Sequence, residues 1–185
     1  MEDYSRSHER QLVVKAKRTS KWQAPNGETV KINFDGALDK EKKFAGIGVI
    51  GRNSKGKVLG TLCNTVTGIK DPEIIEGMAA VRAAEYACMM GFQKIILEGD
   101  ALGIVAQIAY DQGRNQSAVG NRVMDTRLEL NHLVEWPCSH TRRETNGAAY
   151  RLARIVVDRL ESLTWNGGYL EDIKDIVIHE MLLLI

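Results

Sequence analysis

Residues 71–100, DPEIIEGMAAVRAAEYACMMGFQKIILEGD, join a helix pattern to a strand pattern. Asp71 can cap a helix, Pro72 suits its first turn, and apolar residues then recur at helical spacing as far as Gly91. KIILEGD, residues 94–100, is typical of a buried strand that ends in acidic residues. A long helix that leads into a buried strand predicts a crossover unit, and therefore an α/β sheet covered by helices.

Three strand patterns precede this unit. Apolar and polar residues alternate over residues 30–34, and two further runs, AGIGVI (45–50) and KVLGTL (57–62), follow. NSKG, residues 53–56, predicts a hairpin turn between these two runs. We therefore expect the chain to open with an antiparallel meander of three strands, the first of which ends at Asp35.

Weaker patterns follow the central unit. They indicate helices over 101–110, 117–132 and 144–163, and a strand over 133–140 in which Pro137 favours an edge position. The complete order predicts an α/β fold with a mixed five-stranded sheet. Three antiparallel strands lead into parallel crossovers, and helices cover both faces.

Length and composition fit one ordinary globular domain, with 185 residues, 44% hydrophobic and 26% charged. We expect a basic N-terminal lead-in over residues 1–27, the domain itself over 28–165, and a C-terminal amphipathic segment over 166–185. The longest apolar run, MLLLI at the C-terminus, is far shorter than the roughly 20 residues of a membrane helix. No membrane partner is therefore expected.

Charge and cysteine usage add two weaker inferences. The net charge is only +1, but basic residues are in excess over residues 1–60 and acidic residues over 61–185. This split fits a basic surface that meets a polyanion, and it fits an inert patchy surface equally well. The three cysteines are far apart and lack CxxC spacing, so we expect reduced thiols and residence in the nucleus or cytoplasm. The sequence does not indicate an oligomeric state.

Three acidic residues occupy positions suited to catalysis. Asp35 and Asp100 each follow an apolar strand pattern, and Glu76 lies about one turn into the helix between them. Ligands of α/β sheets gather at strand ends, so we expect these carboxylates to converge. Converging carboxylates repel one another unless a cation lies between them, and hard oxygen ligands select Mg²⁺ or Mn²⁺. Divalent ions held in this way are suited to phosphodiester hydrolysis.

Four stretches together resemble one known family: KWQAPNGETVKINFDGA (21–37), GIGVIGRNSKGKVLG (46–60), EGMAAVRAAEYACMMGFQKIILEGDA (76–101) and RRETNGAAYRLAR (142–154). They are similar to the plant reverse-transcriptase-like branch of the ribonuclease H family, which resembles archaeal type 1 ribonuclease H. The resemblance implies a ribonuclease H-like fold. It also implies cleavage of the RNA strand of RNA/DNA hybrids, with Mg²⁺ as cofactor and Mn²⁺ as a substitute.

The resemblance also assigns roles to residues. Asp35, Glu76 and Asp100 match the first three metal-binding carboxylates of the family, which also makes them the catalytic residues. The fourth carboxylate lies four residues after the motif asparagine, Asn146, and this chain has Tyr150 there. A phenol is uncharged at neutral pH and offers a single weak oxygen ligand. We therefore expect weaker metal binding at that position, with activity reduced, dependent on Mn²⁺ or absent.

Four further residues are candidates for substrate binding: Gly36, Ala37, Arg143 and Asn146. The two small residues would allow close approach of a nucleic-acid backbone, or would form a turn at the end of the strand. Arg143 would contact a phosphate, or would form a surface salt bridge. Asn146 would touch substrate, or would cap the last helix.

Two other functions stay open. A catalytically impaired, domesticated retroelement domain would keep the fold and bind nucleic acid or a protein. The chain would alternatively be one domain of a longer retroelement polyprotein. The leading hypothesis is a nuclease whose partner is an RNA/DNA hybrid, recognised by backbone shape and 2′-hydroxyl groups rather than by base sequence.

Overall fold

Six strands form one mixed sheet in the part of the chain that the computed structural model describes, residues 21–110 and 116–184. The order across the sheet is β5-β4-β1-β2-β3-β6, with parallel pairing among β5, β4 and β1 and antiparallel pairing from β1 to β6. The strands are β1 (Val30–Asp39), β2 (Phe44–Arg52), β3 (Val58–Thr67), β4 (Ile95–Gly99), β5 (Cys138–His140) and β6 (Leu163–Asn166).

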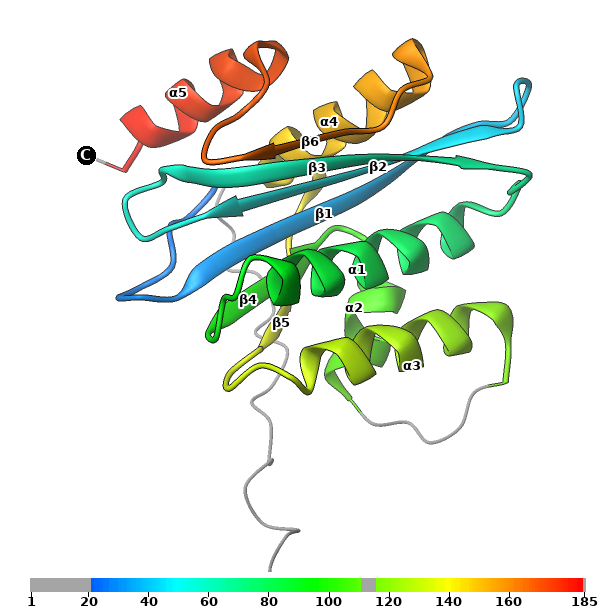
Figure 1. Cartoon of the computed structure of the whole chain (residues 1–185), viewed down its shortest axis with the longest axis horizontal. Helices are drawn as coiled ribbons and strands as arrows, with labels where there is room; N and C mark the ends of the chain where they lie inside the picture. Colours follow the sequence, from blue (N-terminus) through cyan, green and yellow to red (C-terminus); the bar gives the residue numbers. More distant parts are fainter. Residues whose placement is uncertain (1–20, 111–115, 185) are drawn as a thin grey trace, which may run out of the picture.

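Helices cover both faces of this sheet, as predicted (Figure 1). α4 and α5 lie on one face, and α1, α2 and α3 lie on the other. Two 3₁₀ turns, η1 (Arg143–Thr145) and η2 (Glu171–Ile173), precede α4 and α5. The helices are α1 (Pro72–Met89), α2 (Leu102–Ala109), α3 (Ala118–Leu130), α4 (Gly147–Arg159) and α5 (Lys174–Leu182). None of the helices within the described residues is long and apolar enough to cross a membrane.

The sixth strand corrects the prediction of a five-stranded sheet. The predicted helix over 144–163 ends at Arg159, because Leu160 adopts a left-handed conformation with φ of 59° and turns the chain back. The following residues then pair with β3 as β6, in register from Leu163 opposite Cys63 to Asn166 opposite Gly60. Apolar residues just after a helix fit helical spacing and strand alternation equally well, so the pattern did not separate the two.

Three strand boundaries also differ from the prediction. β3 continues to Thr67, five residues beyond the predicted run, and its last residues pair with the start of β2. β1 does not end at Asp35 but continues to Asp39, since its last residues pair with the start of β2 and form a long hairpin. β5 contains three residues instead of the predicted eight. Before it, the predicted strand pairs only through an isolated bridge between Glu135 and Lys94, the residue that precedes β4. β5 does lie at an edge of the sheet, as Pro137 predicts.

The sheet separates two apolar cores. Ile32 and Phe34 of β1 belong to the core under α1, α2 and α3, which is lined by alanines of α1. On the opposite face, Leu152 and Val156 of α4 pack with Val177 of α5 in the second core. The predicted C-terminal amphipathic segment therefore packs onto the domain. Most of the predicted lead-in, residues 1–20, lies outside the described residues.

Candidate active site

The central strand β1 and its parallel neighbour β4 bring two of the predicted carboxylates together. Phe34 of β1 is paired with Gly99, the last residue of β4. The next residues along the two strands, Asp35 and Asp100, therefore lie side by side. Asp35 is completely buried, although it carries a carboxylate.

Gly36 brings the third carboxylate to the same place. A Cβ atom at this position would lie 2.5 Å from Cγ2 of Ile75 and 3.1 Å from its carbonyl carbon. Only a glycine lets the first turns of α1 rest this closely on β1, and Glu76 follows Ile75 directly. α1 begins where the sequence predicts, because the carboxylate of Asp71 accepts a hydrogen bond from the backbone N–H of Glu73 at 2.9 Å.

Asp35, Glu76 and Asp100 form one cluster, in which one ligand oxygen from each lies within 4.8 Å of the others. Among the described residues, Oδ1 of Asp35 and Oε2 of Glu76 are buried without a hydrogen-bond partner. Buried carboxylate oxygens that lack donors are free to accept a cation. Carboxylate oxygens are the ligands that hard divalent cations prefer, so these residues fit a divalent metal.

Burial and mutual repulsion shift the protonation of two of these acids. Burial raises the pKa of Asp35 to about 7, and the charge of Asp100 adds to the shift. Burial also raises the pKa of Glu76 to about 8, with further contributions from Asp35 and Asp100. A cation between the three groups would favour their charged forms and reverse both shifts.

Asn146 lies behind the carboxylates and is only 1% exposed. Its Nδ2 donates to the carbonyl oxygen of Phe34 at 2.9 Å and to Oδ2 of Asp35 at 3.1 Å. Its side chain makes no capping hydrogen bond to α4. The structure therefore gives Asn146 a contact with the carboxylate of Asp35, and buries it away from the surface.

Arg143 lies at the outer side of the cluster, where 62% of its side chain is exposed. Its Nε donates to Oδ2 of Asp100 at 3.1 Å, and this bond to an anion raises the pKa of the guanidinium. The predicted salt bridge of Arg143 thus exists, with a member of the acidic cluster as its partner. The exposed remainder of the guanidinium leaves the predicted phosphate contact possible.

Tyr150 lies on the first turn of α4, and its backbone N–H donates to the carbonyl oxygen of Asn146. Its ring lies beneath the guanidinium of Arg143, with Cζ 5.0 Å from the ring centroid. Arg143 thus contacts both the ring of Tyr150 and Asp100 of the acidic cluster. Because it is a tyrosine, Tyr150 adds no carboxylate to this cluster.

The remaining predicted residue, Ala37, points into the molecule. It packs against Ala153 and Val157 of α4 and is 5% exposed. Neither Gly36 nor Ala37 forms the alternative strand-end turn, because both lie within β1. His140 of β5 has its Nε2 3.1 Å from the carbonyl oxygen of Asp100, which places an imidazole beside the cluster.

Sequence reasoning missed a second group of buried polar residues next to the site. Lys31 and Asn33 of β1 are buried with Glu98 of β4 and Arg52 of β2. Nζ of Lys31 lies 3.0 Å from Oε2 of Glu98, and Asn33 contacts Glu98, Arg52 and Asn146. A signal was available: Lys31 and Asn33 are polar residues in a strand of a sheet that was predicted to have helices on both faces, so their side chains had to be buried.

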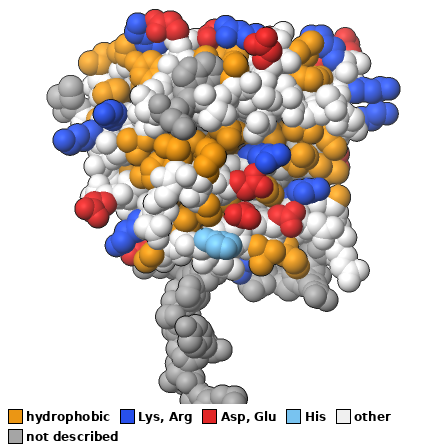
Figure 2. Space-filling model, in the orientation of Figure 1, with side chains coloured by type: hydrophobic (Ala, Val, Ile, Leu, Met, Phe, Trp, Pro, Cys, Tyr) orange, Lys and Arg blue, Asp and Glu red, His pale blue; other side chains and the backbone are white. Residues whose placement is uncertain are grey.

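Charged side chains also mark the surface of the molecule. Figure 2 shows acidic side chains gathered beside apolar ones on one face, with a histidine and basic side chains close by. This mixture of both signs matches the near-zero net charge of the chain. On this face a polyanion would therefore meet local basic groups rather than a uniformly positive surface.

A mixed sheet with this strand order, helices on both faces and acids on adjacent central strands defines a ribonuclease H-like protein. The profile of the family described as reverse transcriptase-like matches residues 33–156, which is more than half of the chain. The chain belongs to this reverse transcriptase-like family. No protein with a curated description matches the sequence.

Solved structures of type 1 ribonucleases H are similar to this chain. Ribonuclease H1 of the archaeon Halobacterium salinarum superimposes with a TM-score of 0.65 at 25% identity, covering 71% of this chain and 98% of that one. The N-terminal ribonuclease H domain of a Mycobacterium tuberculosis protein gives 0.65 at 17% identity, covering 72% and 96%. LC11-RNase H1, from compost, gives 0.63 at 22% identity, covering 71% and 99%, in a complex with an RNA/DNA hybrid. The last two likenesses establish the fold alone.

Proposed function

We propose that this protein is a metal-dependent endonuclease that cleaves the RNA strand of RNA/DNA hybrids. The observation that carries the proposal is the cluster of Asp35, Glu76 and Asp100, whose ligand oxygens lie within 4.8 Å of one another. Three acids this close, one of them fully buried, are unfavourable for stability unless they serve a cation. The similarity of this fold to that of an archaeal ribonuclease H1 supports the choice of reaction.

The carboxylates would hold Mg²⁺, with Mn²⁺ as a substitute, and the bound ions would activate water and stabilise the leaving oxygen of the phosphodiester. Asn146 holds Asp35 in place through the bond to Oδ2. Arg143 is an exposed cation that contacts one of the acids, and it would contact a phosphate of the substrate. The hybrid bound to LC11-RNase H1 supports a hybrid as the substrate class.

Tyr150 is expected to lower the activity rather than to abolish it. It supplies a ring beneath Arg143, where a fourth carboxylate would supply a negative charge and metal-binding oxygens. The site then holds one negative charge fewer, which weakens the second metal more than the first. Mn²⁺ binds oxygen and nitrogen sites less selectively and is expected to restore part of the rate.

The test is cleavage of a labelled RNA/DNA hybrid in Mg²⁺ and in Mn²⁺. The panel contains the wild-type protein, Asp35→Asn, Tyr150→Asp and a matched control, Asp125→Asn. Asp125 is a half-exposed aspartate of α3 that pairs with Arg122 and does not belong to the acidic cluster. We expect cleavage by the wild type and by Asp125→Asn, a loss of at least about 100-fold in Asp35→Asn, and a gain in Tyr150→Asp.

Each outcome decides between the hypotheses. If only Tyr150→Asp cleaved the hybrid, the wild-type protein would have the fold of the nuclease but be inactive because of Tyr150. No cleavage by any folded variant in either metal would overturn the proposal and favour the binding module. Cleavage that survives Asp35→Asn would show that the activity arises elsewhere or from a contaminant.

A further inference from the structure

Asn33 is the centre of the buried polar group beside the acidic cluster, and it is completely buried. Its Oδ1 accepts from Nε1 of Trp22 at 3.0 Å and from Nη2 of Arg52 at 3.1 Å. Its Nδ2 donates to Oε1 of Glu98 at 2.9 Å and to Oδ1 of Asn146 at 3.2 Å. All four hydrogen-bonding positions of the amide are therefore used.

These partners permit only one orientation of the Asn33 amide. An indole N–H and a guanidinium can only donate, so the atom that faces Trp22 and Arg52 must be the oxygen. The nitrogen must then face Glu98 and Asn146. The contacts fix an orientation that would otherwise be ambiguous between oxygen and nitrogen.

The fixed amide of Asn33 in turn selects the orientation of Asn146. Because Asn33 presents an N–H to it, Asn146 must place its own oxygen on that side. Its nitrogen then faces the carbonyl oxygen of Phe34 and Oδ2 of Asp35, which are both acceptors. The opposite orientation would bring the Asn146 oxygen against both of these oxygens, and Oδ2 of Asp35 would lose the donor that Asn146 supplies.

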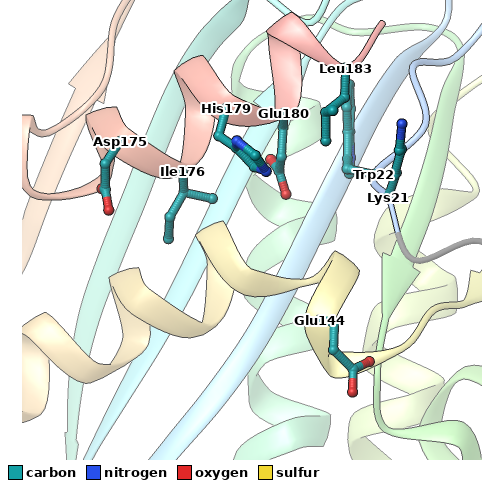
Figure 3. A pocket seen from close by; sticks show the side chains of 8 residues that line it. All are labelled: Lys21, Trp22, Glu144, Asp175, Ile176, His179, Glu180 and Leu183. Carbon is teal, nitrogen blue, oxygen red and sulfur yellow. The ribbon is translucent and has the colours of Figure 1, made fainter.

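The other end of this chain of contacts lies outside the segment that matches the family. Trp22 stacks on Arg52, whose Cζ lies 3.7 Å from the centroid of the ring. Arg52 is 1% exposed and forms an ion pair with Glu180 of α5. Trp22 and Glu180 both line a cavity of about 310 Å³ between the start of the described chain and α5 (Figure 3). Both residues lie outside residues 33–156, the range of the family match.

We propose that Asn33 is a positioning residue of the active site, which keeps Asn146 oriented as a donor to Asp35. Trp22 and the Arg52–Glu180 pair hold Asn33, so α5 contributes to the geometry of the metal-binding carboxylate. This inference rests on the proposed function, since it gives Asp35 the role of a metal ligand. Residues that orient metal ligands typically change metal affinity or activity by roughly 10- to 100-fold when they are removed.

A double-mutant cycle on Asn33→Ala and Asn146→Ala tests the proposal. The readouts are kcat and KM for hybrid cleavage, Mn²⁺ affinity of the substrate-free protein by calorimetry, and the fraction folded under assay conditions. Val58→Ala, a core substitution in β3, is the control for lost stability alone. Asn33→Asp keeps the shape and the acceptor of the amide but removes its N–H donors.

If Asn33 acts through Asn146, the two substitutions are not additive. We expect each single variant to lose roughly 10- to 100-fold in kcat and in Mn²⁺ affinity, with KM within about threefold. The double variant should then lose no more than Asn146→Ala alone. Asn33→Asp should behave like Asn33→Ala, and Val58→Ala should keep kcat and Mn²⁺ affinity.

Trp22→Phe tests the outer contacts, because it removes the N–H donor to Asn33 and keeps an aromatic ring over Arg52. We expect a smaller loss of kcat and Mn²⁺ affinity, of about two- to fivefold. The inference would be overturned if folded Asn33→Ala kept wild-type Mn²⁺ affinity and kcat, or if the losses added in the double variant. The proposed function would still hold in either case, provided that the wild type cleaves the hybrid. A wild type that neither cleaves nor binds Mn²⁺ would overturn both.

Discussion

One strand, β1, carries two buried polar groups on the face that α4 covers. In the balanced group, around Lys31 and Asn33, acidic and basic side chains are paired; in the acidic group, around Asp35, most of the acids have no basic partner among the described residues. At Lys31 and Asn33, each buried acid meets a base: Glu98 pairs with Lys31, and Glu180 of α5 pairs with Arg52. At Asp35, three acids converge, and the exposed Arg143 pairs with one of them. The two groups are two residues apart on the same strand.

The difference lies in how the buried charge of each group is compensated. The balanced group leaves one buried side-chain nitrogen, Nε of Arg52, without a partner among the described residues, whereas the acidic group leaves two carboxylate oxygens. Buried charge is tolerated when it is paired, and unpaired buried charge costs several kcal/mol. The acidic cluster is therefore expected to destabilise the metal-free protein, while the balanced group is expected to depend on its pairs.

The largest expected effect comes from breaking a pair in the balanced group. Arg52→Ala leaves Glu180 buried without a base and removes the cation that stacks on Trp22. We expect a loss of about 3–5 kcal/mol in the free energy of unfolding, measured by denaturant titration. The double variant Arg52→Met with Glu180→Leu removes both charges and should recover most of this loss. A loss below about 1 kcal/mol in the single variant would contradict the comparison.

The next effect is a pH dependence that arises from the acidic group. A carboxyl whose pKa is higher in the folded than in the unfolded chain binds its proton more tightly when folded, so its contribution is present below the unfolded pKa and is lost as the pH rises. The pKa values of Asp35, about 7, and Glu76, about 8, place this loss between about pH 4 and about pH 8. We expect the metal-free protein to lose a few kcal/mol across this window, less than the two shifts taken separately would give, because the two acids titrate as a coupled pair.

The measurement compares urea unfolding of the wild type with that of Asp35→Asn/Glu76→Gln across the same pH range, in a chelator. The difference between the two curves isolates the cluster from all other titrating groups. Added Mg²⁺ should stabilise the wild type at the upper end of the window and leave the double variant unchanged. If the stability of both proteins changed with pH in the same way, the cluster would not be the source of the pH-dependent loss.

A smaller effect is expected where the packing of α1 brings Glu76 to Asp35. Gly36→Ala places a methyl group 2.5 Å from Cγ2 of Ile75, so α1 has to shift away from β1. We expect a loss of roughly 1–3 kcal/mol in the free energy of unfolding. Gly103→Ala in α2 is the matched control, because its nearest neighbour is 3.9 Å away and alanine favours the helix. Equal stability of the two variants would contradict the close approach.

The smallest effect is expected at Arg143, whose side chain is largely exposed. Arg143→Gln should change the free energy of unfolding by less than about 1 kcal/mol, because exposed ion pairs are screened by solvent. If Arg143 contacts a phosphate, the salt dependence of hybrid binding should fall by about one counterion. Binding titrations in chelator at several salt concentrations measure this slope. An unchanged slope would remove Arg143 from the substrate contacts.

The sequence was sufficient to predict that the three acids converge, because strand topology decides it. Asp35 and Asp100 follow the paired residues of two parallel strands, and the capped start of α1 fixes where Glu76 lies. The same reasoning could not place Asn146 behind Asp35. A residue just before a helix is equally suited to capping the helix and to contacting a strand, and only the packing of α4 decides between these roles.

The balanced group was hidden for a different reason. Alternating Lys31 and Asn33 with apolar residues is the pattern of a strand with one solvated face, but β1 is central and covered on both faces. Their partners come from β2, β4 and α5, which lie far along the chain. Glu180 in particular lies in the predicted C-terminal amphipathic segment, whose pattern gave no sign of a buried ion pair.

The short strand β6 has a consequence for the behaviour of the protein at high concentration. It covers Gly60–Cys63 of β3, and the hydroxyl of Ser162 accepts the backbone N–H of Thr65 at 2.9 Å. Without this cover β3 would be an open sheet edge of ten residues, which is a template for edge-to-edge association between molecules. Residues 162–166 thus shield the sheet against aggregation, and a chain cut before them would lose solubility along with the helix that follows.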